Sequence, residues 1–386
     1  MILEGITVHE FDSKNWVVHT PQGRNFLVNQ ATYQLFQILR GCSNLANALE
    51  QFNSQFSANL SEQQFGGLIA EKLGGYHILT EDQSTDKPTL KNQYLKLKFE
   101  LINARWAGIL SKPLQVFYAT AVFWWALLAT VLVILSIYFG VNNASIIGQI
   151  NYPLLAGLAY ATMLIHELGH IAACARCGLK HGGIGFGFYF ILPVMYADVT
   201  NIWLASKHQR IIANMAGIFS ELLYAAILSL LFLLTQNATF LVAAIGIASF
   251  VVWEFNPFVR FDGYWILSDL TNTPNLLPRA TTIFKSIIKK PKKLLSADRN
   301  TVLLFIYGLI NMGFFMAIMG YTLVVHWEAV IHFPITIWEL LKKIAVFKLS
   351  WSDLNRQLFA VTVFYTLLIR LLIGQYQQRI LPKIKS

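Results

Sequence analysis

The chain has 386 residues, of which 55% are hydrophobic and 13% are charged. This composition, with a mean hydropathy of +0.50, excludes an ordinary soluble protein and predicts a membrane protein. Residues 1–100 hold 8 Lys and Arg against 10 Asp and Glu, whereas the remaining residues hold 22 against 10. We therefore expect an acidic soluble domain followed by a basic membrane domain. Three cysteines exclude a disulfide framework, and the opening MILEGITVHEF predicts no cleaved signal peptide.

Short segments with alternating apolar and polar residues open the chain. ITVHEF, NWVVHT and RNFLVN predict three strands. QATYQLFQILRG, NLANALEQFN and SEQQFGGLIAEKLGGYHIL predict three helices, the last with Ser61 as its N-cap. We expect residues 1–85 to form a small α+β domain of winged-helix type. Residues 82–89 are polar and predict a linker. Residues 91–112 are basic and aromatic and predict an interfacial helix, so residues 86–112 are expected to be linker and interfacial helix.

Six apolar segments follow and predict a multi-pass α-helical membrane protein with about six transmembrane helices. They are residues 114–140, 152–175, 211–235, 240–259, 301–325 and 357–374. Lys and Arg are concentrated in the loop 264–299 and in the C-terminal tail, which predicts that both termini are cytoplasmic. The segment 327–356 carries four basic residues and three tryptophans, and it predicts an interfacial hairpin. We expect an integral membrane protein whose apolar helices lie in the lipid bilayer.

The second apolar segment contains His166, Glu167 and His170, which form a His-Glu-x-x-His motif. A charged side chain in a transmembrane helix costs about 2.5–3.5 kcal/mol on insertion, so such residues indicate a function. Positions i and i+4 of a helix share one face, so both imidazoles can reach one metal ion. Zinc prefers such ligands and activates a water molecule, from which Glu167 can take the proton. The motif predicts a hydrolytic Zn²⁺ site at membrane depth.

Two histidines need a third ligand. Asp262 lies in FNPFVRFDGYW just after the fourth apolar segment, where Pro257 and Gly263 interrupt the helix beside Asn256. Such an interruption is tolerated where it lines a site, although it is also what a simple cytoplasmic turn would show. Asp198 is the alternative third ligand.

HELGH in one span and NPFVRFDG two spans later resemble the site-2 protease family of intramembrane zinc metalloproteases. The resemblance covers residues 110–270 and implies His166, His170 and Asp262 as ligands, Glu167 as catalytic base, and access from the cytoplasmic side. The chain departs from the family at AGIFSE, where many members have Gly-Pro-x-x-Asn. Glu221 there either supports a ligand histidine or pairs within the helix bundle.

Two further segments carry open alternatives. HGGIGFGFYFILPVMYADVT (181–200) predicts a re-entrant hairpin, and it is similar to the β element that presents substrate as a strand in site-2 proteases. Cys174 and Cys177 continue the histidine face of the helix. They either bind metal or act in redox chemistry, or they are small packing residues at a helix end.

The pattern of the N-terminal domain resembles the PqqD-like domain, also called the RiPP recognition element. The resemblance implies that a leader peptide binds as a strand beside residues 24–28 and against residues 63–72. A tethered DNA-binding winged helix is the competing interpretation, but this domain is acidic and its third helix offers Lys72 alone against Glu62 and Glu71. We expect no nucleic acid as a partner. A regulatory or assembly domain without a ligand is the third interpretation.

Together these patterns predict a membrane-embedded zinc endopeptidase, similar to peptide zinc metalloproteases. Its domains are residues 1–85 for peptide recognition, 86–112 as linker and interfacial helix, 113–270 as peptidase core, and 271–386 as a basic loop and two further spans. The expected substrate is a peptide or membrane protein, in the maturation or export of a ribosomally made peptide at a bacterial inner membrane. The alternatives are a signalling protease that releases a membrane-anchored regulator and a non-proteolytic accessory of peptide transport.

Overall fold

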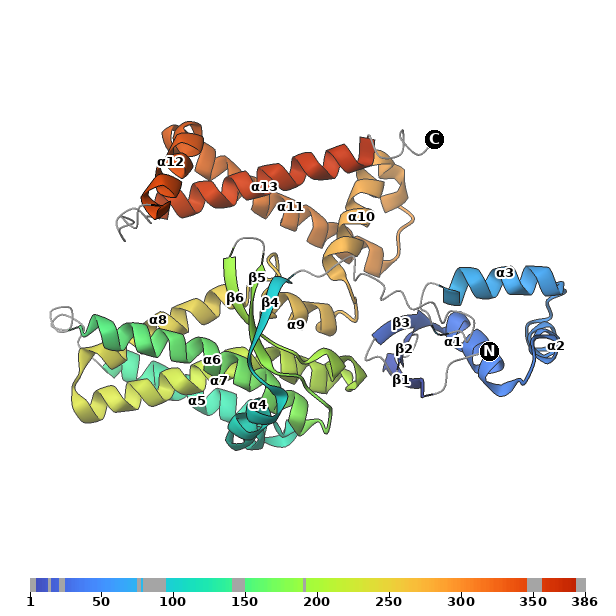
Figure 1. Ribbon diagram of the computed structural model, residues 1–386, viewed down its shortest axis with the longest axis horizontal. Coiled ribbons are helices and arrows are strands. Elements are labelled where there is room, and N and C mark those ends of the chain that lie inside the picture. The colour runs from blue at the N-terminus through green and yellow to red at the C-terminus, as the bar shows by residue number, and fades with distance from the viewer. Residues whose placement is uncertain are drawn as a thin grey trace. The chain divides into compact units, whose positions relative to one another are not determined.

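The computed structural model describes residues 5–12, 15–20, 25–74, 78, 95–140, 150–189, 192–345 and 356–379. This part of the chain is mostly helical and contains two three-stranded sheets (Figure 1). It divides into two compact units, residues 1–274 and 275–386.

The N-terminal domain has the three strands and three helices that the sequence predicts. They are β1 (Thr7–Asp12), β2 (Asn15–His19), β3 (Asn25–Asn29), α1 (Gln30–Gly41), α2 (Leu45–Phe56) and α3 (Glu62–Leu73). The sheet is antiparallel in the order β1-β2-β3, so β3 lies at an edge. Ser61 caps α3 as expected, since its side chain accepts from the Gln64 N–H and the Gln64 side chain bonds back to Ser61. Val28, Phe36 and Phe65 belong to a core of its own. Arg24, most of the GGYHIL segment and the linker 82–89 lie outside the described residues.

The predicted interfacial helix over residues 91–112 is wrong in its first half. Residues 95–102 form β4 (Leu95–Ile102), followed by α4 (Ala104–Ser111) and the 3-10 helix η3 (Lys112–Tyr118). In LKLKFEL, leucine and phenylalanine alternate with lysine and glutamate, which is the period of a strand. Its backbone pairs with an antiparallel strand far along the chain, residues 184–189. Leu97, Phe99 and Leu101 on its apolar face are exposed.

Four described helices are long and apolar enough to cross a membrane, which indicates an integral membrane protein. They are α5 (Thr120–Gly140), α6 (Tyr152–Arg176), α7 (Lys207–Thr235) and α11 (Arg299–Val325). The fourth and sixth predicted spans correspond to shorter apolar helices, α8 (Ala238–Glu254) and the segment Gln357–Ile369. The first predicted span begins late, because residues 112–118 are η3. Helix α7 is central, since it packs against α5, α6, α8 and α9 (Asp262–Leu270).

A β-hairpin connects α6 to α7, as the glycine-rich segment predicts. It consists of β5 (Ile184–Tyr189) and β6 (Leu192–Ala197), and the 3-10 helix η6 (Thr200–Leu204) follows. The sheet order is β4-β5-β6. Strand β5 therefore pairs with β4 along one edge and with β6 along the other. Strand β6 packs against α6, the helix that carries the histidines.

The chain leaves α8 at Glu254 and re-enters a helix at Asp262, so the interruption predicted from Pro257 and Gly263 is present. The Asn256 side chain accepts a hydrogen bond of 2.9 Å from the Phe258 N–H and stabilises this turn. A side chain at position 263 would collide with the backbone of Phe255, so glycine is required by close approach.

The second unit contains α10 (Leu276–Lys289), the 3-10 helix η7 (Pro291–Leu294), α11, α12 (Trp327–Ala345) and α13 (Arg356–Arg379). The predicted loop 264–299 is therefore largely helical. Residues 327–345 form one helix containing Pro334, so the predicted hairpin is wrong over this range, and residues 346–355 lie outside the described part. Tyr365 donates to the Val330 carbonyl at 2.8 Å and stacks on Phe333, which joins α12 to α13.

Candidate metal centre

Helices α6 and α7 approach closely because small residues face each other. A side chain at Gly169 would meet the backbone of Ala216 and the hydroxyl of Ser220. A methyl group at Gly217 would lie 2.5 Å from the His166 ring and 2.6 Å from Nε2 of His170. Small residues let helix backbones come together where the surroundings are apolar. Gly169 therefore allows the two helices to approach, and Gly217 leaves space for the imidazoles.

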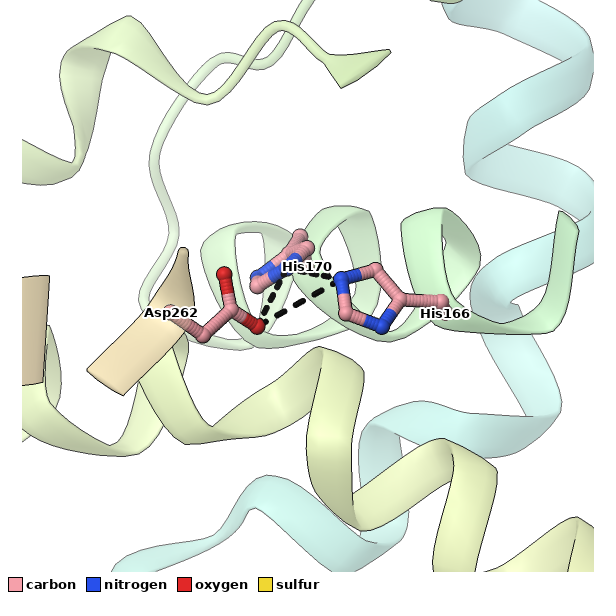
Figure 2. A group of neighbouring side chains, drawn as sticks. All are labelled: His166, His170 and Asp262. Carbon is pink, nitrogen blue, oxygen red and sulfur yellow. Dashed lines mark hydrogen bonds and ion pairs between the residues drawn. The ribbon is translucent and has the colours of Figure 1, made fainter. Parts of the chain in front are cut away.

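Three candidate ligand atoms converge beside these glycines. Nε2 of His166 and Nε2 of His170 are 3.1 Å apart, and Oδ2 of Asp262 lies 3.4 and 3.3 Å from them (Figure 2). A tetrahedral site with metal–ligand bonds near 2.0–2.1 Å has ligand atoms about 3.3–3.4 Å apart. The spacing therefore fits one small cation with two imidazoles and one carboxylate as ligands. Helix α6 supplies both imidazoles, and the first residue of α9 supplies the carboxylate.

The imidazole of His170 is fixed by a hydrogen bond at Nδ1, and that of His166 faces two carboxylates at Nδ1. Nδ1 of His170 lies 2.8 Å from the Ala213 carbonyl, which can only accept, so Nδ1 carries the proton and Nε2 presents a lone pair. Nδ1 of His166 lies 3.2 Å from Oε1 of Glu221 and 3.6 Å from Oε1 of Glu254. Carboxylates in this position select the same tautomer for His166.

Unsatisfied polar atoms gather at this site. Five buried side-chain nitrogen or oxygen atoms of the described residues have no hydrogen-bond partner, and four of them belong to His166, Glu221, Glu254 and Asp262. A buried carboxylate oxygen without a donor is costly unless a cation compensates it, and Oδ2 of Asp262 is both unsatisfied and one of the three converging atoms. Two imidazoles and this carboxylate therefore suit a divalent cation, and zinc accepts such nitrogen and oxygen ligands.

Glu167 is buried, with 9% of its surface exposed, on the same helix as the two histidines. The backbone N–H of Ala197 at the end of β6 lies near its carboxylate. The proposed base on α6 therefore faces the end of the outer strand of the β-hairpin. A carboxylate next to candidate metal ligands can exchange a proton with a water molecule.

Other predicted residues lie outside this cluster. The carboxylate of Asp198 accepts from the hydroxyl (2.7 Å) and N–H (3.2 Å) of Thr200, which makes it a turn residue. Asn256 stabilises the turn before Asp262. Cys174 is buried, and its Sγ lies 3.9 Å from the Lys180 carbonyl. Cys177 is partly buried, and both thiols are free.

Sequence reasoning left Glu254 without a role. The structure makes it part of a second group that could hold a cation, formed by His166, Glu221 and Glu254. Glu254 is the one charged residue in its apolar segment, which could have indicated a function. The sequence does not show which helix its side chain faces. Glu221 is 3% exposed and lies in this group, so it sits behind a candidate ligand.

Comparison with known proteins gives a partial match. The chain is similar to the "Putative peptide zinc metalloprotease protein YydH" of Bacillus subtilis (strain 168), with 28% identity over 107 residues. The match covers 27% of this chain and 42% of that protein, so less than half of the relative's length is matched. No family model and no solved structure matches the chain.

Proposed function

We propose that this protein is a membrane-embedded zinc endopeptidase that cleaves a peptide or a membrane-bound substrate. The convergence of His166 Nε2, His170 Nε2 and Asp262 Oδ2 with the spacing of a tetrahedral site carries the proposal. The similarity to a protein named as a peptide zinc metalloprotease supports a peptide as the substrate class.

Each residue has a distinct task in this account. His166, His170 and Asp262 would hold the metal, which supplies Lewis-acid activation of water and of the scissile carbonyl when bound. Glu167 accepts the proton of the attacking water and returns it to the amine nitrogen that leaves. Ala213, Glu221 and Glu254 hold the imidazoles in the tautomer that turns Nε2 toward the metal.

The edge of β6 is the proposed docking line for the scissile segment. Strand β6 has one free edge in its sheet, packs against α6 and reaches the proposed base through Ala197. An extended peptide can add to such an edge through backbone hydrogen bonds. This geometry would bring an extended peptide bond past the carboxylate of Glu167.

The N-terminal domain is proposed to recognise a leader peptide, in the maturation or export of a ribosomally made peptide. Strand β3 is an edge strand, and Val28 shares a core with α3, so a peptide can be added beside β3. Lys72, the basic residue of α3, is paired with Glu71 at 2.7 Å, which leaves little positive charge for phosphates. Both termini are proposed to be cytoplasmic in a bacterial inner membrane, on the basis of the Lys and Arg distribution.

The test is cleavage by the wild-type protein and by Glu167→Gln in parallel. Candidate peptides are incubated with each purified protein, and the products are identified by mass spectrometry. We expect new termini with the wild type and a rate at least about 100-fold lower with the variant. Equal cleavage by both at equal zinc content would contradict the assigned base.

A further inference from the structure

Phe11 and Asn25 join the N-terminal domain to η6 and α7 of the first unit. The ring of Phe11 in β1 stacks on Trp203 of η6, with centroids 5.7 Å apart and an interplanar angle of 29°. Cζ of Arg210 lies 3.7 Å from the centroid of the same ring. Nearby, the side chain of Asn25 donates to the Thr200 carbonyl at 3.0 Å. Phe11 is thus held between an aromatic ring and a cation.

Arg210 is buried to an unusual degree for a cation, with 2% of its surface exposed. Its Nε donates to Oδ1 of Asp269 at 2.7 Å, and its Nη1 donates to the Ala205 carbonyl at 3.0 Å. Nη2 has no hydrogen-bond partner among the described residues. Because the ring of Phe11 covers this guanidinium, the ring stands where water would otherwise solvate the charge.

Asp269 connects this contact to the metal centre. It lies near the C-terminal end of α9, the nine-residue helix that begins with Asp262. Its second oxygen accepts from the Asn214 side chain at 2.6 Å, so two residues of α7 hold α9. Burial raises the pKa of Asp269 above the usual aspartate value although Arg210 lowers it, which indicates a region of low polarity. An ion pair is stronger in such a region than in water.

We propose that the N-terminal domain docks on the core through Phe11, and that this contact stabilises α9 through Arg210 and Asp269. With Phe11 in place, water is excluded from the Arg210–Asp269 pair, and α9 is fixed at the end opposite to its metal ligand. Without it, the guanidinium is solvated, the pair weakens, and the position of Asp262 becomes less defined. Only the effect of this displacement on metal affinity rests on the proposed function. Phe11, Arg210 and Asp269 are positioning residues that act through Asp262.

The test is hydrogen exchange of the full-length, metal-free protein in detergent, followed by mass spectrometry. Phe11→Ala should accelerate exchange of residues 200–204 and 262–270 about 5- to 30-fold, the range expected for loss of a cation–π contact that is shielded from water. Phe11→Trp, which keeps an aromatic face, should restore protection in both segments. Phe56→Ala is the matched control, because Phe56 packs on Phe52 within the N-terminal domain and should change neither segment.

A second variant keeps the proposal testable. Arg210→Met keeps the length of the side chain without its charge, and it should accelerate exchange of residues 262–270 whether or not Phe11 is present. Cobalt affinity, measured by chelator competition, should fall in Phe11→Ala by the same factor as the exchange changes. Faster exchange of 200–204 alone in Phe11→Ala, or no change in either segment, would overturn the coupling. The metal-free exchange is independent of peptidase activity, so failure of the proposed function would leave this result intact.

Discussion

Replacing Gly217 with alanine should weaken metal binding by a factor of about 100 or more although every candidate ligand is kept. The added methyl carbon would lie 2.5 Å from Cε1 and Nε2 of His166 and 2.6 Å from Nε2 of His170. Ordinary carbon contacts need about 3.5–4.0 Å, so both rings must retreat by about 1 Å. His170 cannot retreat freely, because its Nδ1 is bonded to the Ala213 carbonyl. A displacement of about 1 Å among catalytic groups lowers a reaction rate about 100-fold. We expect the metal affinity to fall by a factor of that size or more.

The assay is chelator competition for Zn²⁺ by wild type, Gly217→Ala and Gly157→Ala. Gly157 lies in the same helix as the histidines, and a methyl group there meets no atom within 4 Å. Gly157→Ala should therefore bind metal like the wild type, with a helix stabilised by up to about 1 kcal/mol. Thermal unfolding distinguishes a folded protein without metal from a misfolded one. Wild-type zinc affinity in a folded Gly217→Ala would refute the reasoning.

Three other predictions follow from the same geometry. Asp262→Ala should lose both zinc and peptide cleavage, whereas Asp198→Ala should keep its zinc. Metal analysis and a cleavage assay on the two preparations test this. Loss of zinc in Asp198→Ala with retention in Asp262→Ala would assign the third ligand to Asp198, next to the β-hairpin. Replacing Glu221 and Glu254 together with glutamine should lower zinc affinity about 10- to 100-fold without removing a ligand, measured by chelator competition; unchanged affinity would mean that these acids do not orient His166. Residues 1–85 alone should fold and bind labelled leader peptide but not labelled duplex DNA at matched salt; tight, steeply salt-dependent duplex binding would reverse the assignment.

The sequence predicted what depends on local spacing. His166 and His170 share a helix face because they are four residues apart, and the structure places them as expected. The N-terminal domain was readable for the same reason, since its strands and helices alternate with clear periods and Ser61 caps α3 as predicted. Asp262 required a resemblance, because nothing in its local spacing shows that it returns to α6.

Features that depend on distant partners were missed. Strand β4 has the alternation of a strand, but its basic and aromatic residues also suit an interfacial helix, and its partner β5 begins about eighty residues later. Glu254 was an isolated charge in an apolar segment, and Arg210 was given no role. Their roles appear only when α7, α8 and α9 are packed together, because each is defined by a contact with another helix. The two shorter apolar helices show a similar limit, since hydropathy alone does not mark where α8 ends at Glu254.

The most direct test of the central claim is the zinc content of the purified protein. Atomic spectroscopy on wild type and on the double variant His166→Ala/His170→Ala, purified side by side, gives the number of zinc ions per chain. We expect one zinc per wild-type chain and almost none in the double variant, because a lone carboxylate does not hold the metal. Near-complete retention of zinc in the double variant would contradict it.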